Sequence, residues 1–376
     1  MVSLSVRFRQ FKILFFVYFF KIFSIFSKKK HWVIAERGCD ARDNAYTFYR
    51  YIKEKHPKVK VYYLMDYSSA DYLKVKADAV QYGSIKSFWL VVTANKIIST
   101  HYAMLFPNLT YKLFRACRLY NKFYFLQHGI IKDNLMILHK KNAPMELFVC
   151  GAKPEYEYVK NTFGHKESVV QYTGLARYDN LHDIKIKRQI LVMPTWRQYI
   201  RTEDEFLSSS YYKNWMRFLI DESLNNLLIE NNCELVFYPH FEMQKYIEHF
   251  NQNNSCIKIA KFKDYDVQTL LKESALLITD YSSVFFDFAY MKKPLLYFQF
   301  DAEDFFSKHY QKGYFDYKIN GFGKVCDTSQ ELVLEIQSLL KNNFLIEDFY
   351  KERIEEFFPL RDRNNCLRIY EKIMEK

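Results

Sequence analysis

Short apolar runs alternate with amphipathic segments through most of the chain, and this alternation limits the fold more than any other feature. In the first half, "HWVIAE" (31–36) is typical of a buried strand, and "DNAYTFYRYIKEKH" (43–56) of a helix. The strand pattern returns at "KVYYLM" (60–65), "KIIST" (96–100) and "FYFLQHG" (123–129). Strands that alternate with helices predict an α/β fold with a mostly parallel sheet.

A second series follows a short polar stretch, "HDIKIKR" (182–188), which we interpret as a linker. Its predicted strands are "QILVMPTWR" (189–197), "CELVFYPH" (233–240), "CIKIA" (256–260), "ALLIT" (275–279) and "PLLYFQF" (294–300). A chain of 376 residues is also too long for one ordinary core. We therefore expect two Rossmann-type doubly wound domains that face each other across a cleft, 31–187 and 188–376, with the terminal helices packing back.

The first 30 residues form a separate segment that is rich in both apolar and basic side chains. Arg7, Arg9, Lys12 and Lys21 interrupt it, Lys28–Lys30 close it, and its longest uncharged run has only eight residues (13–20). Because a spanning helix needs about 20 predominantly apolar residues, we expect a basic amphipathic helix that lies on an anionic membrane surface. A signal anchor and an ordinary packing helix remain alternatives. The protein would then be peripheral, on the cytoplasmic face of the cell membrane.

Charge and cysteine content narrow the class of partner. The formal net charge of +12 indicates an anionic partner, which can be nucleic acid, an acidic membrane surface or a phosphorylated substrate, and charge alone does not choose between them. The seven cysteines are scattered without a C-x-x-C pair, so we interpret them as reduced thiols and expect no zinc. "DYD" (264–266) matches a metal-binding D-x-D, but it directly precedes a helical pattern, and we expect a helix cap there and no dedicated metal site.

Polar residues follow four of the predicted strands, at the place where parallel sheets bind ligands. They are His128-Gly129, Thr195 with Arg197, His240, and the group Thr279, Asp280, Ser282 and Ser283.

Each group of polar residues admits a functional interpretation beside a structural one. Ser282 or Ser283 is expected at a helix N-cap, where exposed N–H groups favour an anion such as a diphosphate; the alternative is a cap that binds nothing. The Arg197 guanidinium suits a phosphate, or else a surface ion pair. His128 can take a proton from an attacking hydroxyl, or be a structural histidine. The same alternatives apply to His240.

Five motifs in this order resemble the CDP-glycerol glycerophosphotransferase family, the teichoic acid primases and polymerases. They are "LQHGIIKDNL" (126–135), "TGLARYDNL" (173–181), "MPTWR" (193–197), "YPH" (238–240) and "LLITDYSSVFFDFAYMKKPLLYFQFD" (276–301). The resemblance implies a GT-B-like fold and transfer of glycerol phosphate from CDP-glycerol to a hydroxyl of a membrane-linked acceptor, with release of CMP and without a cofactor.

The resemblance also implies a role for each site residue. His128 would be the base, and His240 would be catalytic beside the diphosphate. Donor binding would involve the residues at the strand ends of the second domain, namely Thr195, Arg197, His240, Thr279, Asp280, Ser282 and Ser283. Gly129, Arg177 and Asp179 would line the cleft or bind the acceptor. His128 and the donor site would meet only when the two domains close.

Departures from the common pattern leave alternatives open. The frequent "HGTPLK" is here "HGIIKD", and the usual "GYPRND" is here "GLARYD". These changes leave the identity of the acceptor and of the polyol more open than the type of reaction. CDP-ribitol is therefore an alternative donor. A GT-B glycosyltransferase that uses a nucleotide sugar is a second alternative, and a non-catalytic membrane or polyanion-binding protein is a third. The expected partners are the CDP-polyol, a polyprenyl-linked acceptor and the membrane surface, and no nucleic acid.

Overall fold

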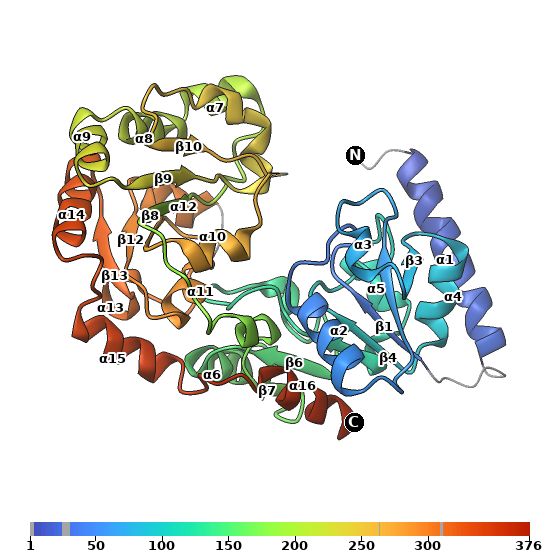
Figure 1. The fold of residues 1–376 in the computed structure, drawn as a ribbon. Helices are drawn as coiled ribbons and strands as arrows, with labels where there is room; N and C mark the ends of the chain where they lie inside the picture. The colour runs from blue at the N-terminus through green and yellow to red at the C-terminus, as the bar shows by residue number, and fades with distance from the viewer. Residues whose placement is uncertain (1–3, 25–30, 263, 309–310) are drawn as a thin grey trace. The chain divides into compact units, whose positions relative to one another are not determined.

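The computed structural model describes residues 4–24, 31–262, 264–308 and 311–376, and the chain folds into two compact units (Figure 1). Unit 1 contains Met1–Ile130, Leu135–Asn180 and Leu360–Lys376, and unit 2 contains Ile131–Asn134 and Leu181–Pro359. This division differs from the boundary expected at 187/188, and the C-terminal segment belongs to unit 1. The C-terminal segment is held on unit 1 in part by Asp179, which accepts hydrogen bonds from the first residues of the last helix.

The sheet of unit 1 is parallel and has the strand order β3-β2-β1-β4-β5-β6-β7. Its strands are β1 (Trp32–Ala35), β2 (Val61–Met65), β3 (Ala79–Gln81), β4 (Lys96–Ser99), β5 (Phe123–Phe125), β6 (Leu147–Cys150) and β7 (Val170–Tyr172). Its helices include α1 (Leu4–Ser24), α2 (Asn44–Lys55), α3 (Tyr72–Val75), α4 (Ile85–Thr93), α5 (Tyr111–Ala116), α6 (Lys153–Thr162) and α16 (Asn365–Met374). The strand order reverses between β1 and β4, which makes this pair the switch point of the sheet.

The sheet of unit 2 is also parallel, with the order β10-β9-β8-β11-β12-β13 and a switch point between β8 and β11. Its strands are β8 (Gln189–Met193), β9 (Glu234–Phe237), β10 (Ile257–Ile259), β11 (Leu276–Thr279), β12 (Leu295–Phe298) and β13 (Gly323–Cys326). Its helices include α7 (Glu203–Ser208), α8 (Ser210–Leu219), α9 (Glu222–Glu230), α10 (Val267–Glu273), α11 (Phe285–Tyr290), α12 (Ala302–Lys308), α13 (Tyr317–Asn320), α14 (Ser329–Lys341) and α15 (Asp348–Phe357).

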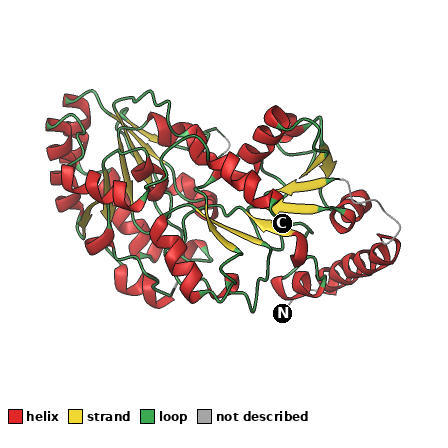
Figure 2. Ribbon diagram, turned by 90° about the horizontal axis from the view of Figure 1, so that it is seen from below, coloured by secondary structure: helices red, strands yellow, loops and turns green. Residues whose placement is uncertain are grey.

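Helices cover the parallel sheets of both units (Figure 2), and this explains why the strands are so strongly buried. Every residue of β1, β4, β11 and β12 is buried, which is typical of a sheet with helices on both faces. In unit 2 the core is centred on Trp215 of α8, which packs against Phe237 and Phe298 of two strands. The expected α/β architecture of two Rossmann-type sheets is confirmed, and the residues that follow the strands can now be placed.

Helix α1 lies along α4 of unit 1 (Figure 1). Phe16 and Phe20 contact Phe88 and Trp89 of α4, and Val17 is fully buried. The opposite side of α1 exposes a stripe of apolar residues, which are Phe8, Phe11, Phe15, Phe19, Ile22 and Phe23. Among the described residues no helix is both long and apolar enough to cross a membrane. The basic run Lys28–Lys30, which closes the predicted membrane-binding segment, lies outside the described residues.

Candidate functional site

The strand ends of unit 2 bring most of the predicted donor residues to one edge of its sheet. Strands β8 and β11 are neighbours at the switch point, so Thr195 and Asp280, which follow them, lie in contact: the Thr195 N–H donates to Asp280 Oδ1 at 2.8 Å. The His240 N–H, after β9, donates to the Pro194 carbonyl at 3.3 Å. This edge is where open α/β sheets bind ligands.

The Arg197 guanidinium is fully buried and bound to two carboxylates. Its Nη2 lies 2.9 Å from Asp280 Oδ2, and its Nε and Nη2 donate to Asp301 at 2.8 and 2.9 Å. Tyr281 and Phe305 place their rings about the same cation, each with its centroid 5.1 Å from Cζ. These contacts neutralise its charge inside unit 2 and favour a structural role, and the predicted contact of Arg197 with the donor stays a prediction.

Thr279 and Asp280 are also interior residues, and their predicted contact with the donor likewise stays a prediction. The Thr279 hydroxyl donates to the Met193 carbonyl at 2.6 Å, which ties β11 to β8. Asp280 accepts from the Tyr281 N–H at 2.6 Å in addition to its contacts with Thr195 and Arg197, and both side chains are fully buried. These contacts favour structural roles at the edge of the sheet for both residues.

Three hydroxyl groups at the same edge have a different setting. Ser282 and Ser283 are half-buried, and the Ser282 hydroxyl accepts from the Val284 N–H at 3.4 Å. The N-cap of α11 is Val284, so the cap predicted at Ser282 or Ser283 is wrong by one or two residues. Thr195 Oγ1 is buried and has no hydrogen-bond partner among the described residues. A buried hydroxyl without a partner costs about 1–3 kcal/mol, which a bound phosphate oxygen would relieve.

His240 is an exposed donor at the end of β9. Its Nδ1 accepts from the Glu242 N–H at 3.2 Å, so the neutral ring carries its proton on Nε2. The ring stacks near Trp196, with centroids 6.1 Å apart and planes 18° from parallel. This arrangement holds an N–H donor at the ligand edge of unit 2, which is suitable for a phosphate oxygen.

In unit 1, a network of buried side chains fixes the backbone before His128. Gln127 has a left-handed backbone (φ +59°), which is uncommon for a residue other than glycine. Asn44 Nδ2 donates to the Gln127 carbonyl at 2.9 Å, and Gln127 Nε2 donates to Glu155 at 3.1 Å and to the Val149 carbonyl. The sharp turn after β5 therefore presents the His128 side chain, which is exposed.

The predicted acceptor residues of unit 1 have internal contacts. Gly129 is buried. Arg177 forms an ion pair with Asp43 at 2.7 Å and donates to the His128 carbonyl at 2.8 Å, so it stabilises the backbone at His128. Asp179 accepts from the N–H groups of Asn365 and Cys366, both at 2.9 Å, at the start of α16. These contacts favour structural roles for Arg177 and Asp179, and their predicted role in acceptor binding stays a prediction.

Two further residues follow strands of the unit 1 sheet, at the edge where His128 lies, and they were not predicted from the sequence. His101 follows β4, and its ring stacks on His128 with centroids 4.7 Å apart. Arg37 follows β1 and forms an ion pair with Asp40. Desolvation by the surrounding protein lowers the pKa of His128, although the residue is partly exposed to solvent. The Arg177 and Arg37 cations lower it further, and Asp43 and a hydrogen bond with the Thr100 backbone oppose them. A neutral imidazole near pH 7 is the form that a general base needs.

The N-terminus of α2 already holds a carboxylate of the chain. Glu36, directly after β1, accepts from the N–H groups of Arg42, Asp43 and Tyr46 at 3.1, 2.9 and 3.0 Å. Burial raises the pKa of Glu36 to about 8, and the neighbouring Asp43 charge contributes. This helix end is therefore occupied by Glu36.

The expected helix cap at "DYD" is confirmed, because Asp266 caps α10 and accepts from the Thr269 N–H at 2.9 Å. Within residues 4–24, 31–262, 264–308 and 311–376, no group of three or more His, Cys, Asp or Glu side chains is arranged to hold a metal ion.

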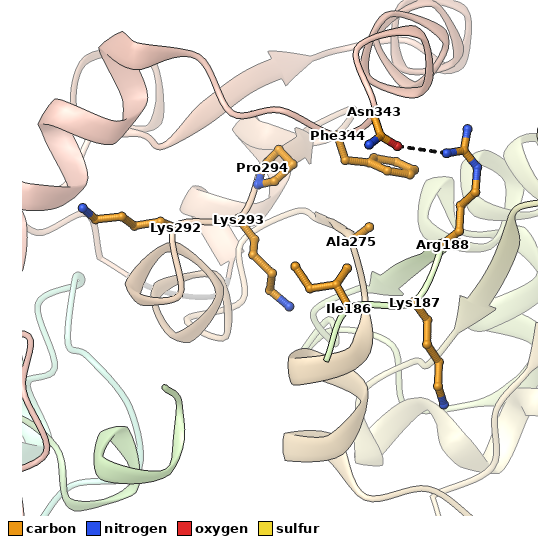
Figure 3. Close-up of a pocket in the computed structure, with 9 residues that line it drawn as sticks. All are labelled: Ile186, Lys187, Arg188, Ala275, Lys292, Lys293, Pro294, Asn343 and Phe344. Atoms are coloured by element: carbon orange, nitrogen blue, oxygen red, sulfur yellow. Dashed lines mark hydrogen bonds between the residues drawn. The ribbon is translucent and has the colours of Figure 1, made fainter. Parts of the chain in front are cut away.

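A basic pocket lies at the other end of the unit 2 strands, before β8, β11 and β12 (Figure 3). Its volume is about 410 Å³. Its cations have partners: Lys187 pairs with Glu273, Lys292 with Glu355, and Arg188 donates to Asn343 at 3.1 Å. The pocket is therefore distinct from the ligand edge and adds nothing to the donor site.

Comparison with known families identifies the chain. The model of the CDP-glycerol:poly(glycerophosphate) glycerophosphotransferase family matches residues 16–375. The chain belongs to this family. Its similarity to the minor teichoic acid biosynthesis protein GgaB of Bacillus subtilis is 35% identity over 373 residues, which cover 94% of this chain and 41% of GgaB. The chain thus spans less than half the length of that relative.

Other relatives and solved structures agree with this family and with the fold. The teichoic acid poly(glycerol phosphate) polymerase of Bacillus subtilis is 32% identical over 188 residues, 49% of this chain and 23% of that protein. The structure of the wall teichoic acid polymerase TagF matches with a TM-score of 0.68 at 16% identity, covering 100% of this chain and 99% of that one. The fold of this family member is therefore GT-B-like.

Proposed function

We propose that this family member transfers glycerol phosphate from CDP-glycerol to a hydroxyl of a membrane-linked acceptor, in the synthesis of a teichoic acid or a related phosphopolymer. The match of the family model across residues 16–375 carries the proposal. The strand-end groups of both units support it, because transfer from a diphosphate needs donors to phosphate oxygens and a base for the incoming hydroxyl.

The proposed reaction is a displacement at the β-phosphorus of the donor. The acceptor oxygen forms a new P–O bond, the bond from that phosphorus to the bridging oxygen breaks, and CMP leaves with the bridging oxygen. His128 takes the acceptor proton. His240 Nε2–H and the hydroxyls of Thr195, Ser282 and Ser283 donate to the diphosphate as its charge shifts, while Arg197 holds the strand ends that carry them.

Ribitol phosphate is the alternative group to be transferred. Relatives of this chain include the teichoic acid ribitol-phosphate polymerase TarL of Staphylococcus aureus, 27% identical over 173 residues, 41% of this chain. A nucleotide-sugar donor is a second alternative.

The experiment that tests the proposed function is a donor screen with purified full-length protein and detergent-solubilised lipid acceptors. CMP release is measured with CDP-glycerol and CDP-ribitol, and release of the nucleotide with a set of nucleotide sugars. Release that depends on CDP-glycerol and on acceptor is the expected result. Turnover with CDP-ribitol alone would reassign the donor, and turnover with a nucleotide sugar alone would overturn the proposal.

Replacing His240 with alanine should lower kcat/KM for the CDP donor by about 10- to 100-fold, because the diphosphate loses a charge-stabilising donor. His249 in the same unit is a matched control. It pairs with Glu203 at 2.8 Å, and it lies away from the strand ends. His249→Ala should keep the kcat/KM of the parent protein. If His240→Ala also kept it, His240 would have no part in donor binding or catalysis.

We propose that α1 attaches the protein to an anionic membrane surface, on the cytoplasmic face. The exposed stripe of α1 is rich in phenylalanine, and the exposed Arg7, Arg9 and Lys12 lie on the same helix. Apolar side chains that enter the lipid boundary and basic ones that meet anionic headgroups are the combination that interfacial helices use. The packed side of α1, which contains Val17, would stay on α4.

Replacing Phe11, Phe15 and Ile22 together with serine should weaken binding to phosphatidylglycerol vesicles by at least about tenfold, because each buried apolar side chain contributes roughly 1.5–3 kcal/mol. High salt should weaken binding of the parent protein by screening its charges. The control replaces two exposed apolar residues of unit 2, Ile229 and Leu334, with serine. Unchanged binding of the α1 variant would contradict the proposal. If carbonate washing failed to remove the protein from cell membranes, a spanning segment would be indicated instead.

A further inference from the structure

A second histidine lies beside the proposed base, at the end of the neighbouring strand. Strands β4 and β5 are parallel and paired, with Ser99 opposite Phe125. His101 and His128 follow these two strands and stack, with ring centroids 4.7 Å apart and planes 13° from parallel. The sheet itself therefore brings the two imidazoles together, at the edge where ligands bind.

The His101 ring is held in place from its own strand. Its Nδ1 lies 2.9 Å from the Thr100 hydroxyl, and its backbone N–H donates to the Ser99 hydroxyl at 3.1 Å. Desolvation lowers the pKa of His101 well below the ordinary value, and the positive charges of His128 and Arg37 act in the same direction. His101 is thus a flat, neutral ring with a fixed orientation near pH 7.

Such a ring complements the other contacts around His128. The contacts with Arg177 and with Gln127, through Asn44, fix the backbone at the turn. The imidazole itself hydrogen-bonds the Thr100 backbone, and the stack with His101 adds a second restraint on rotation about its side-chain bonds. A stacked aromatic ring restricts that rotation, and its face also tolerates the imidazolium that forms when His128 takes a proton.

We propose that His101 is a positioning residue that holds the His128 imidazole in the orientation required to take the proton of the acceptor hydroxyl. This inference rests on the proposed function, in which His128 is the base. It assigns His101 no contact with the substrate.

The first test separates the stack from other roles of His101. His101→Ala should lower kcat for CMP release by about 10- to 100-fold, since misplacing a reacting group by about 1 Å can cost that much. The KM for CDP-glycerol should change by less than about twofold, because the donor is not contacted. His101→Phe keeps a flat ring and should recover most of the loss. His139→Ala, which removes a ring stacked on Phe163 at 4.5 Å, is the matched control and should leave kcat unchanged.

Chemical rescue makes the inference distinguishable from the proposed function. Added imidazole should restore part of the activity of His128→Ala by binding in the vacated place against His101. In the double variant His101→Ala/His128→Ala, the imidazole concentration for half-maximal rescue should rise by about 2- to 12-fold, which corresponds to the roughly 0.5–1.5 kcal/mol of an aromatic pair.

Each outcome bears on one of the two claims. Full activity of His128→Ala without imidazole would overturn the base and the inference together. A dead His128→Ala with a fully active His101→Ala would overturn the positioning role alone. Equal losses in His101→Ala and His101→Phe, with rescue unaffected by His101, would also overturn it, since the stack would then contribute nothing.

Discussion

Replacing His128 with alanine should lower the rate of CMP release by roughly 10²–10⁴-fold, the usual contribution of a general base. The exposed His128 imidazole is presented by the turn after β5, and its backbone is braced by Arg177 and by the left-handed Gln127. Because the base acts on the acceptor, the KM for CDP-glycerol should stay within about twofold of the parent value. Steady-state kinetics with saturating acceptor measure both quantities.

The acidic limb of the pH profile gives an independent check on the same residue. As the pH falls, His128 becomes protonated and can no longer accept a proton, so kcat/KM should fall. Desolvation, Arg177 and Arg37 lower the pKa of His128 against the opposing effect of Asp43, which places the midpoint of this limb below pH 6.5. A midpoint well above pH 6.5, or the same limb in a slow His128→Ala variant, would assign the limb to another group.

The fold was predictable because its signals are local. Buried strands such as β1 and β11 are short apolar runs bounded by polar residues, and their periodicity survives in the sequence. The rule that ligands bind at the carboxyl ends of parallel strands then led to His128, His240 and the serine pair. His101 obeys the same rule, since it directly follows "KIIST", and a complete count of the strand ends would have included it.

The contacts of the site that the sequence did not reveal involve partners far along the chain. Arg197 looks like a phosphate ligand from its place after β8, yet Asp301, which neutralises it, lies 104 positions along the chain. Likewise, nothing near Asp179 indicates that it caps a helix formed by Asn365 and its neighbours. Burial and pairing of charges are decided by tertiary packing, which periodicity in one segment does not reveal.

Replacing Arg197 with alanine should destabilise unit 2 by about 3–5 kcal/mol, because Asp280 and Asp301 would be left buried without their counter-charge. For a unit of this size the loss corresponds to a fall of roughly 10 °C in the unfolding temperature. Calorimetry or a thermal shift assay measures it. Arg201, exposed and four residues along the chain, is the control, and Arg201→Ala should change stability by less than about 0.5 kcal/mol.

The conservative variant Arg197→Lys decides between a structural role and direct contact with the donor. A lysine keeps the charge but cannot make two bonds to Asp301 while it approaches Asp280, so it should still lower the unfolding temperature. At a temperature where the variant is folded, its KM for CDP-glycerol should stay near the parent value, because the guanidinium meets carboxylates and not phosphate. Full thermal stability combined with a large rise in KM would mean that Arg197 reaches the diphosphate, and that the donor displaces a carboxylate to get there.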